Sequence, residues 1–289
     1  MKIFLFHFNR RARLSLFLLL GCCLLPLSTL RAAEPALEFW IHPYMHAPDL
    51  VRRFTPLAQY LEAKSGRKIE IRISPTYQNH EERVAAERMD LAFIGPFGYV
   101  QMTERNKEPK TILAALEGNG KSVFHGVIAV RKDAPFKTVR DLAGRSFAFA
   151  DKESTMGTLL PRFMLQEAGV GMAGLSRYSF LNTHNDVALA VLGGFYDAGG
   201  LKEEVFLEYA PRGLRMLART PPVPEHLFLA SRKLPPALVQ TLRQALLQLK
   251  DPAILTPIQK NATGMAPATD RDYDLLRHIY RNLGPMPGE

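Results

Sequence analysis

Cysteine is almost absent from this chain of 289 residues. Its two cysteines, Cys22 and Cys23, stand next to each other within the first 33 residues. Beyond residue 33 the sequence therefore has no disulfide, no thiolate metal site and no cysteine nucleophile.

The chain also lacks the clusters of lysine and arginine, interleaved with aromatic residues, that are typical of nucleic-acid-binding surfaces. Its formal net charge is +9. Five basic residues and no acidic ones lie in residues 1–33, so a charge of +4 remains beyond them. This modest positive charge suits a small anionic ligand, and nucleic acid is not expected as a partner.

Residues 1–33 have the pattern of an export signal. Basic residues from Lys2 to Arg13 precede an apolar run at 14–25, and a polar exit follows at 31–34. The pattern predicts a signal peptide that is cleaved after Ala32 or Ala33. The alternative is a lipoprotein tethered through acylated Cys22, which ranks second because the apolar run continues past that residue.

Strand and helix patterns alternate along the rest of the chain. Residues 37–41, 69–73 and 90–96 have strand patterns, and amphipathic helical stretches lie between them. After Gly118–Gly120 the alternation starts again, which predicts an α/β protein with two lobes. Lobe 1 is expected to comprise residues 34–120 and 221–289, and lobe 2 residues 121–220. A cleft between two lobes is a common place for a small ligand.

The most informative segment is the turn Ser154–Gly157, between a predicted strand at 145–150 and a helix. Hydroxyl groups and free backbone N–H groups at such a turn can hold a small anion. Serine and threonine also cap helices without any ligand. A helix capped at Ser154 would carry Pro161 inside it and kink, whereas a helix that begins near Thr158 would leave Ser154–Gly157 as a loop of free amides.

The chain resembles the periplasmic phosphonate-, phosphite- and phosphate-binding proteins of ABC importers. The resemblance rests on the order and spacing of motifs at Phe39–Tyr44, Asp90–Phe97, Ser154–Pro161, Thr183–Ala190, Tyr196–Gly199 and Thr220–Pro224. It implies a two-lobed type II periplasmic-binding-protein fold with a ligand cleft between the lobes. It also implies a monomer that captures a phosphorus oxyanion in the periplasm for an ABC permease of the inner membrane, without catalysis and without a cofactor.

The resemblance also implies which residues bind the ligand. These are Tyr77, Ile94, Ser154, Thr155, Met156, Gly157, His184 and His226. Three of them replace residues that the family uses: Met156 stands for a serine, Ile94 for an aromatic donor and His226 for an acid. Asn185 likewise stands where the family often has an acid, and Glu204 aligns only loosely as a carboxylate that could meet an ammonium group. The site therefore suits an aminoalkyl phosphonate less well.

The lost donors bear on ligand identity. A charge-assisted hydrogen bond contributes about 1.5–3 kcal/mol, so two missing donors would weaken binding on the order of tenfold to several thousandfold. One hypothesis is that Met156 and Ile94 form an apolar wall against an alkyl group of the ligand.

Two other functions use the same residues. An enzyme would need Ser154 as nucleophile, His184 as base and Asp186 or Asp197 to orient the base, but no Gly-x-Ser-x-Gly motif surrounds Ser154. A sensing protein would keep the fold and present its ligand to a membrane sensor kinase instead of a permease.

A third alternative is a metal site on the loop that holds His42, Tyr44 and His46. Alternate spacing without nearby carboxylates is weak support for zinc, so we expect these residues at the rim of the cleft.

Overall fold

The structure is a computed structural model that describes residues 34–108 and 110–284. The predicted signal peptide and Cys22 lie outside these residues. The described chain is mixed α/β, which confirms the fold class predicted from the alternating pattern. No helix in this part of the chain is long and apolar enough to cross a membrane.

The first sheet has six strands in the order β13-β4-β12-β3-β1-β2. Its strands are β1 (Leu37–Ile41), β2 (Ile69–Ile73), β3 (Leu91–Ile94), β4 (Thr111–Gly118), β12 (Leu227–Ala230) and β13 (Ala262–Ala266). Strands β1, β2 and β3 are parallel, and β12 lies antiparallel between β3 and β4. In β1, Leu37, Phe39 and Ile41 are buried and alternate with half-buried residues, as expected for a strand packed mainly on one face.

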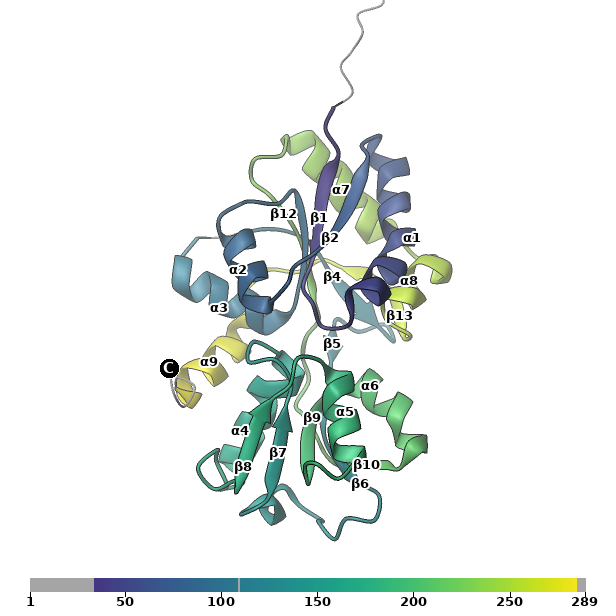
Figure 1. The fold of residues 1–289 in the computed structure, drawn as a ribbon. Helices are drawn as coiled ribbons and strands as arrows, with labels where there is room; N and C mark the ends of the chain where they lie inside the picture. The colour runs from purple at the N-terminus through teal and green to yellow at the C-terminus, as the bar shows by residue number, and fades with distance from the viewer. Residues whose placement is uncertain (1–33, 109, 285–289) are drawn as a thin grey trace, which may run out of the picture. The chain divides into compact units, whose positions relative to one another are not determined.

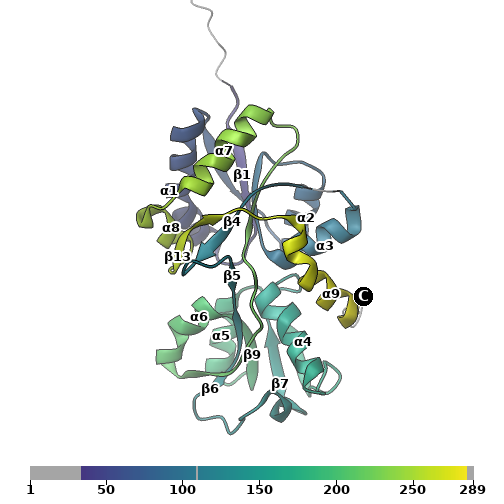
Figure 2. The ribbon, with the colours of Figure 1, turned by 180° about the vertical axis from the view of Figure 1, so that it is seen from behind.

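Helices cover both faces of the first sheet (Figures 1 and 2). Helices α1 (Ala47–Ser65), α7 (Pro236–Gln248) and α8 (Pro252–Ile258) share one apolar core with it, and α2 (Tyr77–Ala85), α3 (Pro96–Asn106) and α9 (Asp274–Leu283) share the other. Helix α1 begins beside Pro48 and ends at Gly66, which has φ 67° in the left-handed region that glycine adopts most easily.

The second sheet has five strands in the order β10-β6-β9-β7-β8. Its strands are β6 (Gly126–Arg131), β7 (Ser146–Phe149), β8 (Arg177–Phe180), β9 (Ala198–Lys202) and β10 (Leu214–Arg219). Helices α5 (His184–Leu192) and α6 (Glu203–Tyr209) pack on one face, and α4 (Leu160–Glu167) packs on the other. Both sheets belong to one compact unit that starts at Ala36.

The chain passes between the two sheets twice. It leaves the first sheet after β4 and returns to it after β10, and the two crossing segments pair through the short strands β5 (Val123–Phe124) and β11 (Val223–Pro224). Thr220 ties the crossings together, because its hydroxyl oxygen accepts a hydrogen bond from the Gly126 amide at 2.9 Å. Figure 2 shows β5 between the two sheets.

Neither of the two geometries considered for Ser154–Pro161 is found as such: Ser154 does cap a helical turn, but that turn is π-helical and the α-helix begins after it. Residues Thr155–Leu159 form one π-helical turn, and α4 begins only at Leu160. Pro161 therefore stands in the first turn of α4, where its missing N–H costs little. No proline interrupts the interior of α4.

Candidate phosphorus-oxyanion site

The turn after β7 is held by its own hydrogen bonds. Ser154 Oγ accepts from the Gly157 amide at 3.1 Å, and the Ser154 carbonyl accepts from the amides of Thr158 and Leu159. Thr155 and Met156 open the π-helical turn, and the first N–H groups of a helix have no partner within it. Ser154 is thus both a cap and a hydroxyl that can still donate its own hydrogen.

This turn forms one wall of a small cavity of about 20 Å³. The cavity is lined by His42, Tyr44, Tyr77, Gly95, Phe124, Glu153, Ser154, Thr155, Met156, His184, Lys202 and His226. Residues from both sheets contribute to it. This volume is the space open to the centres of water-sized groups, so a compact ligand suits the cavity better than a bulky one.

His184, the first residue of α5, presents a donor to this cavity. Thr183 caps the helix and exchanges hydrogen bonds with Asp186, which fixes the position of the imidazole. The backbone amide of Lys202 donates to His184 Nδ1 at 3.3 Å, so the hydrogen of the neutral ring is on Nε2, 3.5 Å from Ser154 Oγ. Burial, and then the nearby Lys202, lower the pKa of His184 to about 3.

His226 is held from behind by a buried carboxylate. Its Nδ1 lies 2.9 Å from Glu225 Oε2, and the side chain of Glu225 is fully buried. Gln259 links this carboxylate to Lys202: its amide donates to Glu225 at 2.9 Å, and its oxygen accepts from Lys202 Nζ at 2.6 Å. The His226 ring also stacks on Phe93, with centroids 5.0 Å apart.

Thr155 and Met156 join the two sheets. The Phe97 amide, at the start of α3, donates to Thr155 Oγ1 at 3.0 Å. Met156 is buried, and its sulfur accepts a weak hydrogen bond from the Thr220 hydroxyl at 3.7 Å. Both residues also line the small cavity.

The structure brings most of the expected residues together, but not Ile94. Tyr77, Ser154, Thr155, Met156, His184 and His226 all line the small cavity, and Gly157 lies directly behind Ser154. Ile94 does not line it: its side chain is buried in the core between the first sheet and α3. The next residue, Gly95, lies between β3 and α3, and its backbone lines the cavity instead.

A comparison with models of known protein families assigns the chain to a family. Residues 39–273 match the family described as ABC transporter, phosphonate, periplasmic substrate-binding protein. The chain belongs to this family. Its members are substrate-binding proteins, which confirms the resemblance, the predicted phosphonate, phosphite or phosphate class of ligand, and the expectation of a binding protein rather than an enzyme.

Two proteins that are similar in sequence to this chain support the assignment. The phosphate-import protein PhnD of Mycolicibacterium smegmatis is 28% identical over 267 residues, which cover 82% of each chain. The phosphonates-binding periplasmic protein of Escherichia coli is 25% identical over 134 residues, 45% of this chain and 39% of that protein.

A solved structure shares the fold of this family member. PhnD1 of Prochlorococcus marinus in complex with methylphosphonate superimposes with a TM-score of 0.76 at 20% identity, covering 86% of this chain and 98% of that one. This confirms the predicted type II periplasmic-binding-protein fold.

Some of the residues that line the small cavity were not predicted from the sequence. His42 and Tyr44 were expected only at a rim, and Lys202, Glu153 and Gly95 were not singled out for the ligand. His42, Gly95 and Lys202 stand at or directly after the carboxyl ends of β1, β3 and β9. Ligands of open α/β sheets gather at such ends, so the strand ends were the signal that could have found them.

The hydrogen bonds of the described residues do not form a catalytic triad. Asp186 accepts from Thr183, and Asp197 accepts from the Ser146 hydroxyl at 2.7 Å. The nitrogen of His184 that an acid would orient accepts instead from the Lys202 amide. Among the described residues, no group of three or more histidine, cysteine, aspartate or glutamate side chains is placed to hold a metal ion.

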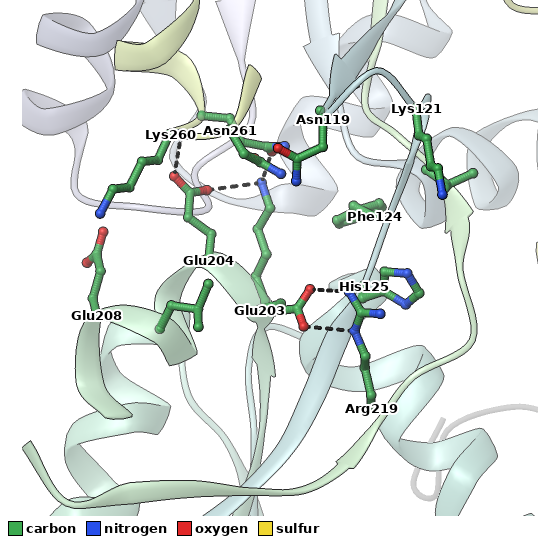
Figure 3. Close-up of a pocket in the computed structure, with 15 residues that line it drawn as sticks. Asn119, Lys121, Phe124, His125, Glu203, Glu204, Glu208, Arg219, Lys260 and Asn261 are labelled. Carbon is green, nitrogen blue, oxygen red and sulfur yellow. Dashed lines mark hydrogen bonds and ion pairs between the residues drawn. The ribbon is translucent and has the colours of Figure 1, made fainter. Parts of the chain in front are cut away.

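Figure 3 shows a second and larger cavity, of about 600 Å³. Phe124 and Lys202 line both this cavity and the small one. Four charged side chains of the larger cavity form two pairs. Arg219 donates two hydrogen bonds to Glu203 at 2.8 and 2.7 Å, and Glu204 lies 3.5 Å from Lys202 Nζ. None of the eight residues expected from the sequence lines this cavity.

Proposed function

We propose that the small cavity is the binding site for the phosphorus oxyanion of this protein. The single observation that carries the proposal is that hydroxyl, imidazole and ammonium groups from both sheets converge on a space that holds only a few atoms. Ser154, Thr155, Tyr77, His184 and His226 supply donors, and Met156 supplies an apolar wall.

We further propose that the two sheets act as lobes that close on the ligand. Lobe 1 comprises residues 34–120 and 221–289, and lobe 2 residues 121–220, with the paired strands β5 and β11 as the hinge. The Phe97–Thr155 hydrogen bond joins the lobes directly beside the cavity. Hinge closure around a ligand is the usual motion of two-lobed binding proteins.

The cellular context that we propose follows from the family and from the leader. Residues 1–33 direct export, the protein acts in the periplasm as a monomer, and the closed, loaded form delivers its anion to an ABC permease in the inner membrane. A Cys22 variant distinguishes a tethered protein from a freely diffusing one. The mutation would release a protein that is anchored by a lipid on Cys22, and it would leave the location of an unanchored protein unchanged.

The test is a calorimetric and thermal-shift panel on protein that starts at Glu34. The anions are phosphate, phosphite, methylphosphonate, 2-aminoethylphosphonate and sulfate. A ligand present at a hundred times its dissociation constant should stabilise the fold by about 2.7 kcal/mol. The proposal is wrong if no phosphorus oxyanion raises the melting temperature.

The site is then located with a matched pair of serine variants. Ser154→Ala removes one donor and should weaken binding by about 10- to 150-fold, the equivalent of about 1.5–3 kcal/mol. Ser176→Ala removes an exposed hydroxyl outside the cavity and should leave affinity unchanged. Equal affinities for the two variants would place the anion elsewhere.

A further inference from the structure

His42 is a buried imidazole with no hydrogen bond. It follows β1, is 3% exposed, and neither Nδ1 nor Nε2 has a partner among the described residues. Its ring stacks on Tyr44 at 4.9 Å, lies 5.1 Å from Tyr77 and 5.3 Å from His226. Buried polar groups are normally satisfied, so the unpartnered N–H of this neutral ring, at the wall of a small cavity, indicates a ligand that accepts a hydrogen bond from it.

His226 carries the arrangement that lets an imidazole hold a proton. Glu225 accepts from Nδ1–H at 2.9 Å, which leaves Nε2 as the free nitrogen beside Gly95. An ideal Cβ on Gly95 would lie 3.8 Å from His226 Nε2 and 3.4 Å from His42 Cε1, so both rings border the same wall of the cavity. A carboxylate behind an imidazole orients the ring and favours its cationic form.

The surroundings of His226 favour different protonation states without and with an anion. Burial lowers the pKa of this ring, although the Glu225 carboxylate opposes the effect. Without an anion, Nε2 therefore holds a lone pair, which would repel an oxyanion. With an anion against it, the cationic form becomes favourable, and Nε2–H donates a charge-assisted hydrogen bond.

Other charged or titratable groups lie near His42 and His226, and a test must separate their proton uptake from that of His226. They are Lys202 on β9, Glu204 on α6, His184 on α5, His80 on α2, and Asp151 and Glu153 before the π-helical turn. Glu153 is the competing proton carrier, because burial and the adjacent Asp151 raise its pKa to about 8.

We propose that His42 and His226 bind the anion, and that each anion captured brings one proton onto His226 Nε2, supported by Glu225. The proton comes from solvent and forms an N–H bond at the former lone pair; no covalent bond to the ligand forms or breaks. The inference rests on the proposed function, because it names two further residues and a protonation step at the same site.

One linked proton gives a defined pH dependence. Affinity for an anion whose own charge is constant should fall about tenfold per pH unit over the range in which free His226 is neutral and bound His226 is cationic. The protein would thus bind most tightly in mildly acidic medium.

The test is calorimetry with inorganic phosphate at pH 8.5, in buffers of different ionisation enthalpy, together with ¹⁵N spectra of the histidine rings. Wild type should take up about one proton per anion, and both nitrogens of His226 should be protonated in the complex. His226→Gln keeps an amide donor but cannot take up a proton, so it should bind with uptake near zero. His46→Gln should match wild type, because the structure places this histidine on the exposed loop before α1 and not in the lining of either cavity.

His42 is tested with a variant that keeps its ring packing. His42→Phe removes both unpartnered nitrogens, so the melting temperature without ligand should hold or rise, while affinity for phosphate should fall at least tenfold. An unchanged affinity with an intact melting temperature would overturn the role of His42.

Three results would overturn the role of His226. These are binding by wild type without proton uptake, a neutral His226 ring in the complex, and uptake that persists in His226→Gln but disappears in Glu153→Gln. A wild-type protein that binds no phosphorus oxyanion between pH 6 and pH 9 is a different result, because it contradicts the proposed function itself.

Discussion

Gly157 has no room for a side chain. An ideal Cβ at this position would lie 2.2 Å from Ala150 Cβ, 3.0 Å from Ser154 Oγ and 3.1 Å from His184 Cε1. Two of these three neighbours line the small cavity. The glycine is thus required by close approach, since its φ is not in the left-handed region.

We expect Gly157→Ala to displace the turn from β7 and from α5. Overpacking of this kind costs about 1–3 kcal/mol, so the free energy of unfolding in urea should fall by that amount and phosphate affinity should fall with it. The matched control is Gly264→Ala on β13, where the new methyl meets the flexible end of Lys250 and can be accommodated. Equal losses in the two variants would mean that the turn tolerates a methyl group.

Glu153 predicts a pH dependence of stability. Its pKa is raised to about 8, first by burial and then by Asp151, from an ordinary value of 4.5. A carboxyl with a raised pKa stabilises the fold fully below its unfolded pKa, and this stabilisation is lost as the pH rises through about 8.

The permanently neutral Glu153→Gln should therefore melt at a higher temperature than wild type at pH 9 and at nearly the same temperature at pH 5. Thermal melts of ligand-free protein at the two pH values measure this difference. Glu167→Gln, on an exposed position of α4, should follow wild type at both. A lower melting temperature of Glu153→Gln at pH 9 would contradict the assignment.

At the scale of elements, the segment before α9 is tied to the segment that carries His226. Tyr273 is fully buried, and its hydroxyl donates to the Glu225 carbonyl at 2.8 Å. Its ring packs edge-on against Tyr99 of α3 at 5.2 Å. The segment around Tyr273 thus supports the proposed binding site without lining the small cavity.

Tyr273→Phe should leave the Glu225 carbonyl without this partner and lower the free energy of unfolding by about 1–3 kcal/mol in urea denaturation. Tyr280→Phe is the control, because the hydroxyl of Tyr280 has no hydrogen bond among the described residues and its ring contact with Phe97 is kept. The prediction fails if the two variants lose the same stability.

Features that depend on near neighbours in the sequence could be predicted, and features that depend on how the two sheets are joined could not. Alternating apolar residues such as Ile69, Ile71 and Ile73 predicted a strand correctly, because a local period of two depends only on near neighbours. The turn at Ser154–Gly157 was found for the same reason, since capping is local. Lys202 and His42 could not be placed, because their meeting depends on how two sheets are joined. Ile94 and Gly95 differ by one position, and only the later one, just past the end of β3, borders the cavity, whereas the Ile94 side chain is turned into the core.

At the scale of the molecule, one hydrogen bond reports closure of the two proposed lobes. Thr155→Val removes the acceptor for the buried Phe97 amide, so the closed form should lose about 1–3 kcal/mol, equal to about fivefold to 150-fold in phosphate affinity. Small-angle scattering at phosphate concentrations that saturate each protein should then show less compaction than in wild type, so that the loss of the Thr155 donor to the anion does not enter the comparison.

The control for closure is Thr158→Val. The Thr158 hydroxyl donates to the Asp151 carbonyl at 2.7 Å within the second proposed lobe, so its loss should lower stability and leave compaction unchanged. If Thr155→Val closes as completely as wild type, the Phe97–Thr155 bond does not hold the lobes together.

The strand order has a consequence for how the chain folds. β12 lies between β3 and β4, yet it follows them in the sequence by more than a hundred residues, after the whole second sheet. All strands of the second sheet lie within residues 126–219, so this sheet can form without any later part of the chain. In the first sheet, the facing edges of β3 and β4 stay unpaired until β12, residues 227–230, inserts between them. Pairings so distant in sequence form slowly. The first sheet is therefore the last to be completed, and any chain that stops before β12 carries those open edges.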